Sequence, residues 1–78
     1  MQPHIELQQR LEKDLGDLLS DSRSVNNVQA SIGIEKKEDE LSKQEVDTLR
    51  DIASDLNWNF KGFEWDYNKQ QTFAVFER

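Results

Sequence analysis

The stretch Leu41–Asn57, LSKQEVDTLRDIASDLN, carries the clearest structural signal in the chain and predicts a helix. Ser42 can accept a hydrogen bond from the backbone N–H of Glu45, while the Glu45 side chain can reach back to the backbone N–H of Ser42. Apolar residues then recur every three or four positions, which is the spacing of one buried helix face. We therefore expect a helix from Lys43 to about Leu56.

Upstream of this helix, the chain predicts a strand and, before the strand, another helix. In Val28–Glu35, VQASIGIE, apolar and polar side chains alternate, as expected for a half-buried strand. Over Pro3–Asp21, five leucines fall within one arc of a helical wheel, and charged residues occupy the other side. The residues between these two segments are rich in Ser, Asp and Asn and predict a connecting loop.

Downstream of the helix, residues 58–76 are rich in aromatic side chains and predict a hairpin. A three-residue loop at Asn68–Gln70 would pair Trp65 with Phe73 and gather the apolar residues of both strands on one face. A two-residue loop would pair Trp65 with Thr72 instead. We expect the longer loop, because it keeps the apolar residues together.

The alternation changes phase at Lys61–Gly62, which leaves two arrangements open for the aromatic residues nearby. Without a β-bulge there, Trp58, Phe60 and Phe76 would form an exposed apolar patch on the sheet face away from the helices. With a bulge, Trp58 and Phe60 turn into the core and the patch shrinks to Phe76. A small domain needs its aromatic residues inside, which favours the second arrangement.

The order of elements is therefore helix, strand, helix, strand, strand, and the predicted fold class is α+β. We expect a three-stranded mixed sheet with both helices packed on one face, built as a single domain over residues 1–78. The first two strands would run parallel, either directly adjacent or with the last strand between them.

The residue composition argues against most catalytic chemistry. The 78 residues include no cysteine and one histidine, so disulfides, thiolate nucleophiles, zinc–thiolate sites and iron–sulfur clusters are not expected in a monomer. We expect no enzyme activity, no metal and no cofactor. No apolar run approaches the about 18 residues that span a bilayer, so we expect a cytoplasmic protein that does not contact membranes.

Negative charge is spread along the whole chain, whose formal net charge is -6. Because net negative charge repels phosphate, direct binding to nucleic acid is not expected. On both predicted helices, carboxylates recur in rows that lie away from the apolar stripe. These residues are Asp14, Asp17 and Asp21 on the first helix and Asp47, Asp51 and Asp55 on the second.

Two rows of carboxylates on a small rigid body can imitate a nucleic-acid backbone and occupy a basic groove of another protein. The simpler interpretation is a solvated helix face that keeps the protein soluble. Duplex DNA carries a charge about every 1.7 Å of its axis, and these rows are sparser. Both interpretations remain open from the sequence.

The segment Leu49–Phe63, LRDIASDLNWNFKGF, resembles the helix followed by aromatic-x-Gly-aromatic that ends members of the ribonuclease E inhibitor family. Phe60, Gly62 and Phe63 occupy the matching positions. That family usually has Asp before the glycine and Trp after it, where this chain has Lys61 and Phe63. The resemblance implies an acidic, ferredoxin-like regulator that inhibits an enzyme by binding to it.

The sequence therefore predicts a non-catalytic protein-binding module, an inhibitor or adaptor that engages a basic or nucleic-acid-handling protein. Its contacts would be the six aspartates named above together with Trp58, Phe60 and Phe76. In size and charge, the chain also resembles small acidic proteins that phages make against host enzymes. Two alternatives remain. One is a homodimer that pairs through the free sheet face or the edge strand Val28–Glu35, and the other is a single-stranded RNA binder that uses Trp58 and Phe60.

Overall fold

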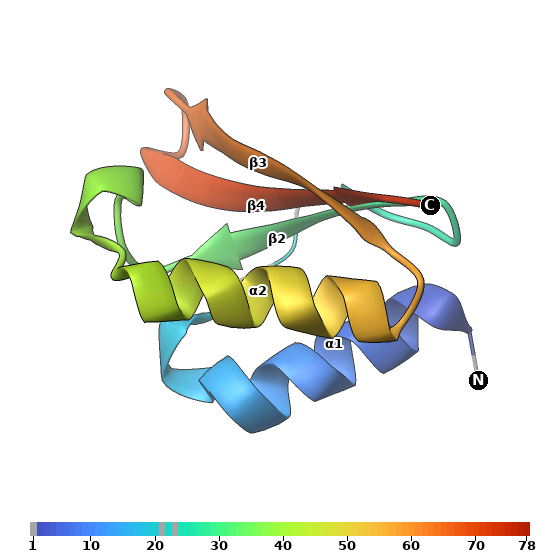
Figure 1. The fold of residues 1–78 in the computed structure, drawn as a ribbon. Coiled ribbons are helices and arrows are strands. Elements are labelled where there is room, and N and C mark those ends of the chain that lie inside the picture. Colours follow the sequence, from blue (N-terminus) through green and yellow to red (C-terminus); the bar gives the residue numbers. More distant parts are fainter. Residues whose placement is uncertain (1, 21, 23) are drawn as a thin grey trace.

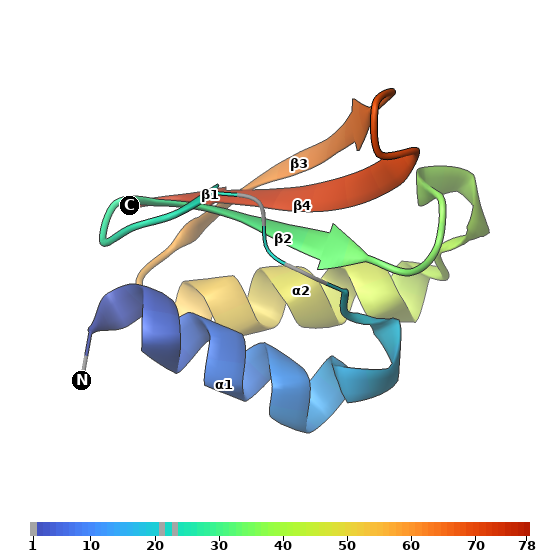
Figure 2. The same cartoon turned by 180° about the vertical axis from the view of Figure 1, so that it is seen from behind.

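The computed structural model describes residues 2–20, 22 and 24–78, and its elements follow the predicted order with three short additions. The helices are α1 (Pro3–Leu15) and α2 (Lys43–Asp55), and the short 3-10 turns are η1 (Gly16–Leu18) and η2 (Glu38–Glu40). The strands are β1 (Ser24–Val25), β2 (Gln29–Ile34), β3 (Asn59–Asp66) and β4 (Gln71–Glu77). Both helices lie on one face of the sheet, so the predicted α+β class and layering are confirmed (Figures 1 and 2).

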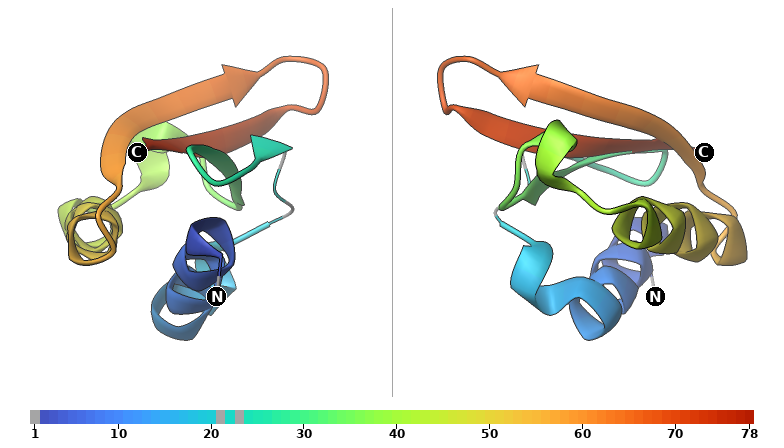
Figure 3. Two further views of the ribbon diagram at one scale, coloured as in Figure 1. Left: turned by 90° about the vertical axis from the view of Figure 1, so that its right-hand side faces the viewer. Right: turned by 60° about the vertical axis from the view of Figure 1, so that its left-hand side comes forward.

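The sheet has the strand order β1-β2-β4-β3, and every pairing between these strands is antiparallel. The prediction of a mixed sheet is wrong in that respect. The last strand lies between the other two long strands, so β2 and β3 run in the same direction without pairing. This is the second of the two expected arrangements. Figure 3 shows the resulting two layers, with the sheet above the helix pair.

The segment that follows α1 occupies the outer edge of β2. The backbone N–H of Ser20 donates to the carbonyl of Gly33 at 2.8 Å, and β1 pairs with β2 further along. Helix α1 therefore ends at Leu15 and not at the predicted Asp21, because the following segment satisfies backbone groups on the sheet. For the same reason, Val28–Glu35 is not the free edge strand that the dimer hypothesis requires.

Helix α2 begins at the capping box that the sequence predicts. Ser42 Oγ accepts a hydrogen bond from the N–H of Glu45 at 3.1 Å, and Glu45 Oε1 accepts one from the N–H of Ser42 at 2.9 Å. The helix ends before Asn57, whose φ of 64° is the left-handed conformation that closes many helices. Its apolar face packs with the α1 leucines and the inner side chains of the sheet. The buried core consists of Leu7, Leu11, Leu18, Ala30, Ile32, Ile34, Leu49, Ile52, Ala53, Trp58, Ala74 and Phe76.

A β-bulge between Phe60 and Gly62 turns the aromatic residues on both sides of it toward the helices. Gly62 has a φ of 115°, which residues with a side chain rarely adopt. The extra residue changes the phase of β3, so that Phe60 pairs with Phe76 and Phe63 pairs with Ala74. The bulged alternative is therefore confirmed. The expectation that Phe76 stays on the exposed face is wrong, because this residue belongs to the core.

The hairpin register differs by one residue from the predicted one. Trp65 pairs with Thr72 and not with Phe73, because the turn spans the four residues Tyr67–Gln70. Asp66 Oδ1 closes this turn by accepting hydrogen bonds from two of its backbone N–H groups, at 2.9 and 3.1 Å. The last turn residue has a φ of 53°. A one-residue change of register moves each β4 side chain to the face opposite the expected one.

Candidate protein-interaction surface

The outer side of the helix pair carries a group of carboxylates that we call the acidic helix layer. It consists of Asp14, Asp17, Asp47, Asp51 and Asp55, all of which are exposed. Three of these residues come from α2, on the side opposite its buried residues, and the other two come from the end of α1 and the η1 turn. Asp21, the sixth predicted member, lies outside the described residues.

Arg10 joins the two rows of aspartates. Its Nε lies 3.2 Å from Oδ2 of Asp14 on the same helix, and its Nη2 lies 3.6 Å from Oδ2 of Asp55 on α2. This contact joins the middle of α1 to the last residue of α2, and the two helices run in opposite directions (Figure 1). The two predicted rows therefore form one continuous surface.

The negative charge of the acidic helix layer is only partly offset. Each ion pair at an exposed surface contributes only about 0–1 kcal/mol to the free energy of unfolding. The contacts with Arg10 are therefore weak, and the carboxylates of its partners stay accessible. Asp17, Asp47 and Asp51 make no ion pair with any other residue in the described part of the chain. The layer can therefore attract basic groups over roughly one Debye length, about 8 Å at physiological ionic strength.

The predicted aromatic patch does not form. Trp58 is 3% exposed and Phe76 is 0% exposed, both within the core. Phe60 is half-buried, with its ring centroid 5.2 Å from that of Phe63 and 5.3 Å from that of Phe76. The guanidinium of Arg50 lies 5.9 Å from the Phe60 ring centroid. Trp58 is therefore not available to stack on a base, which removes the structural basis of the RNA-binding alternative.

An exposed aromatic pair lies instead at the turn end of the hairpin. Tyr67 is 82% exposed, and its ring meets the half-buried Trp65 edge-on, with the centroids 6.4 Å apart. Trp65 also lines a hollow of about 230 Å³ between the hairpin and the connection from β2 to α2. Sequence reasoning missed this pair because it assigned both rings to the core from their face alone. Trp65 does share a face with the buried Thr72, but its ring is only half-buried and that of Tyr67 is exposed. The signal that could have found it is the position of Tyr67 beside turn residues.

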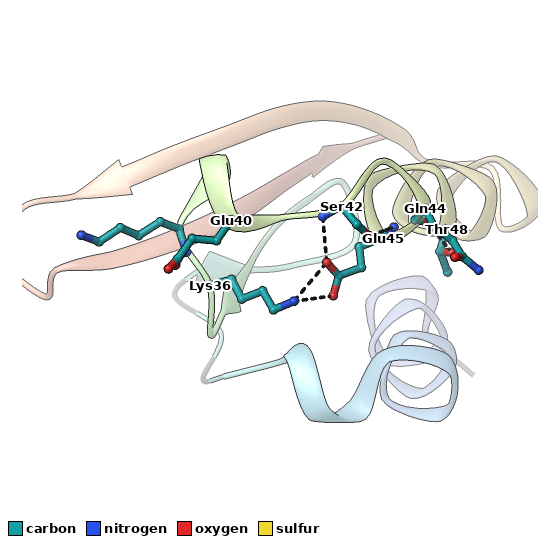
Figure 4. A network of polar contacts seen from close by, with 7 residues as sticks. Lys36, Glu40, Ser42, Gln44, Glu45 and Thr48 are labelled. Atoms are coloured by element: carbon teal, nitrogen blue, oxygen red, sulfur yellow. Dashed lines mark hydrogen bonds and ion pairs between the residues drawn. The ribbon is translucent and has the colours of Figure 1, made fainter.

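A polar network fixes the start of α2 (Figure 4). Lys36 Nζ lies 3.1 and 3.2 Å from the two carboxylate oxygens of Glu45, the side chain that also accepts the N–H of Ser42. The hydrogen bond from the Ser42 backbone and, second, the bond from Lys36 hold the pKa of Glu45 below its ordinary value. The charge of Lys36 is therefore directed toward α2.

A second hollow, of about 490 Å³, adjoins the acidic helix layer between the end of α1 and the Lys36–Glu45 pair. Its lining includes acids such as Asp17 together with Lys13 and Lys36. Across the described ranges, no group of three or more His, Cys, Asp or Glu side chains is arranged to hold a metal ion. None of the helices that the structure describes has both the length and the apolar character that crossing a bilayer requires.

Comparison with protein-family models, with curated proteins and with solved structures found no match to this chain. The resemblance of Leu49–Phe63 to the ribonuclease E inhibitor family therefore gains no support from the comparison of families.

Proposed function

We propose that this protein is a non-catalytic binding module that inhibits or recruits a protein with a basic surface, such as one that handles nucleic acid. Its contact surface is the acidic helix layer. The observation that carries the proposal is the joining of two aspartate rows into one exposed surface through Arg10. We place its action in the cytoplasm, in keeping with a chain that has no cysteine.

The rigidity of the helices supports this proposal. Asp47, Asp51 and Asp55 recur every fourth residue, which spaces them about 6 Å apart along α2. Both helices are packed against the sheet through buried residues, so the spacing between carboxylates is fixed before a partner arrives. Aspartate also has a short side chain and therefore loses little rotamer freedom on binding. A preformed row of charges loses less entropy on binding than a flexible acidic tail does.

The homodimer alternative lacks a comparable observation in its favour. Segments from the same chain already occupy the outer edge of β2. On the opposite edge of the sheet, β3 carries the bulge at Gly62 and an exposed Lys61, two features that discourage pairing with another strand. A concentration-independent monomer in sedimentation would exclude assembly as the primary role.

Charge reversal at two aspartates that do not contact Arg10 tests the proposal. Immobilised wild-type protein and the Asp47→Lys/Asp51→Lys variant are compared for proteins that they retain from an extract of the native host. We expect the wild type to retain a basic protein that the variant does not retain. Duplex DNA added at low salt should displace that protein if the layer occupies a nucleic-acid groove.

The matched control is Glu64→Lys/Glu77→Lys on the sheet face away from the helices, which changes the net charge equally at another place. The control should retain the partner nearly as well as the wild type, because electrostatic attraction falls with distance. If both variants lose the partner to the same extent, the effect comes from net charge alone and the acidic helix layer is not the contact surface. If the wild type and both variants retain the partner equally, the aspartates do not contact it. The remaining interpretation is then a solvated helix face that keeps the protein soluble.

A further inference from the structure

We infer that the hollow beside Trp65 receives an arginine side chain of the basic partner, as a second contact separate from the acidic helix layer. The inference rests on the proposed function, since a partner with a basic surface supplies the arginine. Figures 1 and 2 both place the hairpin turn next to the β2–α2 connection at the same end of the molecule. The helices lie against one face of the sheet, and this turn lies at the end of the β3–β4 hairpin (Figure 3).

The size of the hollow suits one side chain. Its volume of about 230 Å³ lies below the roughly 300–1,000 Å³ of sites for complete small-molecule ligands. Its walls are held in place by hydrogen bonds within the chain. Gln71 Nε2 donates to the carbonyl of Ile34, which ties the hairpin to the end of β2, and Asp66 closes the hairpin turn. A side chain would therefore enter a preformed site.

The aromatic wall of the hollow favours a planar cation. Elsewhere in the chain, the guanidinium of Arg50 lies 5.9 Å from the ring centroid of Phe60. By contrast, no cation of the described residues lies over Trp65 or Tyr67, although Tyr67 is open to solvent. Guanidinium groups stack on aromatic rings, and arginine, tyrosine and tryptophan are the residues most enriched where binding energy concentrates.

The charged residues around the hollow also favour a cation. Glu35 and Glu40 line it, whereas Lys36 is held 3.1 Å from a carboxylate oxygen of Glu45. Among its described lining residues, Lys37 is then the cation without an ion-pair partner. Glu40 Oε1 already accepts the backbone N–H of Lys37 at 2.8 Å, so a guanidinium stacked on the indole can direct its N–H groups to Glu35 and to Oε2 of Glu40. An acidic side chain would face both glutamates and could pair only with Lys37.

The experiment is a titration of the ¹⁵N-labelled protein with the peptide acetyl-Gly-Arg-Gly-amide, followed by NMR. We expect saturable shifts at the indole N–H of Trp65 and the backbone N–H of Tyr67. The buried indole of Trp58 should not move. The same peptide with citrulline in place of arginine keeps the shape of the side chain and removes its charge, and it should not saturate the site. Equal shifts with both peptides, or no shift at the hairpin, would overturn the inference.

Three substitutions identify the groups that carry the effect. Tyr67→Leu should weaken peptide binding by about two- to five-fold, because it removes one exposed ring face without disturbing the core. Trp65→Phe keeps the packing and should weaken binding to a similar extent. Lys37→Gln should strengthen binding of the arginine peptide. If Lys37→Gln weakens binding, and a glutamate peptide shifts the wild-type hairpin, the occupant is acidic and the inference is wrong.

The Asp47→Lys/Asp51→Lys variant separates this inference from the proposed function. Its hairpin should respond to the arginine peptide as the wild type does, because the reversed charges lie on the outer side of the helices. Loss of the host partner with an intact hairpin response supports both contacts. A wild-type hairpin that does not respond, while the variant still loses the partner, overturns the arginine site alone.

Discussion

Nη2 of Arg10 on α1 lies 3.6 Å from Oδ2 of Asp55 on α2, and its Nε lies 3.2 Å from Oδ2 of Asp14. One cation of the chain is thus shared between the acidic rows of both helices. Arg10 acts as an internal counter-ion, and any other basic group that binds these carboxylates must compete with it. This relationship makes the charge of the layer adjustable by a single substitution.

Replacing Arg10 with glutamine should strengthen binding of cationic ligands to the acidic helix layer. The substitution frees Asp14 and Asp55 from their shared partner and increases the local negative potential. Its cost in the free energy of unfolding should stay within about 1 kcal/mol, because both ion pairs are exposed. Fluorescence anisotropy with a labelled nona-arginine peptide measures the affinity, and the dependence of binding on salt should become steeper.

The control for this prediction is Lys61→Gln. Lys61 also sits in an exposed ion pair, with Nζ 3.8 Å from Oε2 of Glu77, but it lies on β3, away from the helix layer. The two variants have the same net charge. If they bind the peptide equally, Arg10 has no local role and net charge explains the change.

Removing the N-cap hydroxyl with Ser42→Ala should lower the free energy of unfolding by about 1 kcal/mol. The hydroxyl oxygen accepts the N–H of Glu45 at 3.1 Å, and alanine leaves that donor without its partner. For a domain of this size the melting temperature should fall by roughly 4–8 °C per kcal/mol, which calorimetry measures. Ser54 is at an exposed position within α2, and Ser54→Ala should not lower the free energy of unfolding. A decrease as large as that of Ser42→Ala would contradict the capping role.

The stability contributed by Glu45 should depend on pH in the acid range. Hydrogen bonds from the Ser42 backbone and Lys36 lower the pKa of Glu45 from its ordinary value of 4.5 in the folded state. The unfolded chain then binds more protons than the folded one below that value, so the free energy of unfolding rises with pH. The contribution is complete above about pH 4.5 and is lost as pH falls through the lowered pKa.

Urea unfolding of the wild type and of Glu45→Gln at several pH values measures this contribution. The variant should be less stable at pH 7, and the difference should shrink as the wild-type carboxylate becomes protonated. A difference that stays constant down to pH 3 would show that the charge of Glu45 is not what stabilises the capping box.

Gly62→Ala should destabilise the protein by about 1–3 kcal/mol, because alanine is strained at a φ of 115°. Apart from Gly62 and its two chain neighbours, no atom lies within 4 Å of the position that the added Cβ would take, so the effect comes from the local backbone conformation. Gly16→Ala is the matched control. Gly16 has an ordinary helical φ of -53° and equally open space, so this substitution should stabilise by roughly 0.4–1 kcal/mol. Denaturant midpoints that move in the same direction for both would contradict the bulge geometry.

Local signals in the sequence predicted the parts of the fold that local chemistry determines. The Ser42–Glu45 capping box fixed the start of α2, and the two-residue alternation located β2 to within one residue at either end. Two features depended on contacts that local patterns do not contain. Helix α1 ends early because later residues pair with β2, and β4 takes the central position in the sheet.

The candidate surface was predictable to a similar extent. Helical spacing placed the aspartates on the outer side of each helix, but the contact of Arg10 with Asp55 requires the packing of α1 against α2. The positions of the aromatic residues were harder to predict, because the sheet face on which each ring lies depends on one bulge and on the length of one turn. The turn that Asp66 closes has four residues and not the predicted three. That single extra residue exchanged the faces of the β4 side chains and moved Phe76 into the core.

The placement of Phe76 can be tested by comparing its truncation with that of Tyr67. Phe76 is fully buried, so Phe76→Ala should cost about 3–5 kcal/mol and leave a domain of this size largely unfolded. Phe76→Leu removes less volume and should give a smaller loss that urea unfolding can still measure. Tyr67 is 82% exposed, and Tyr67→Ala should change the free energy of unfolding by no more than about 0.5 kcal/mol. If Phe76 instead lay on an exposed sheet face, its two substitutions would be as mild as that of Tyr67, and the register of β4 described above would be wrong.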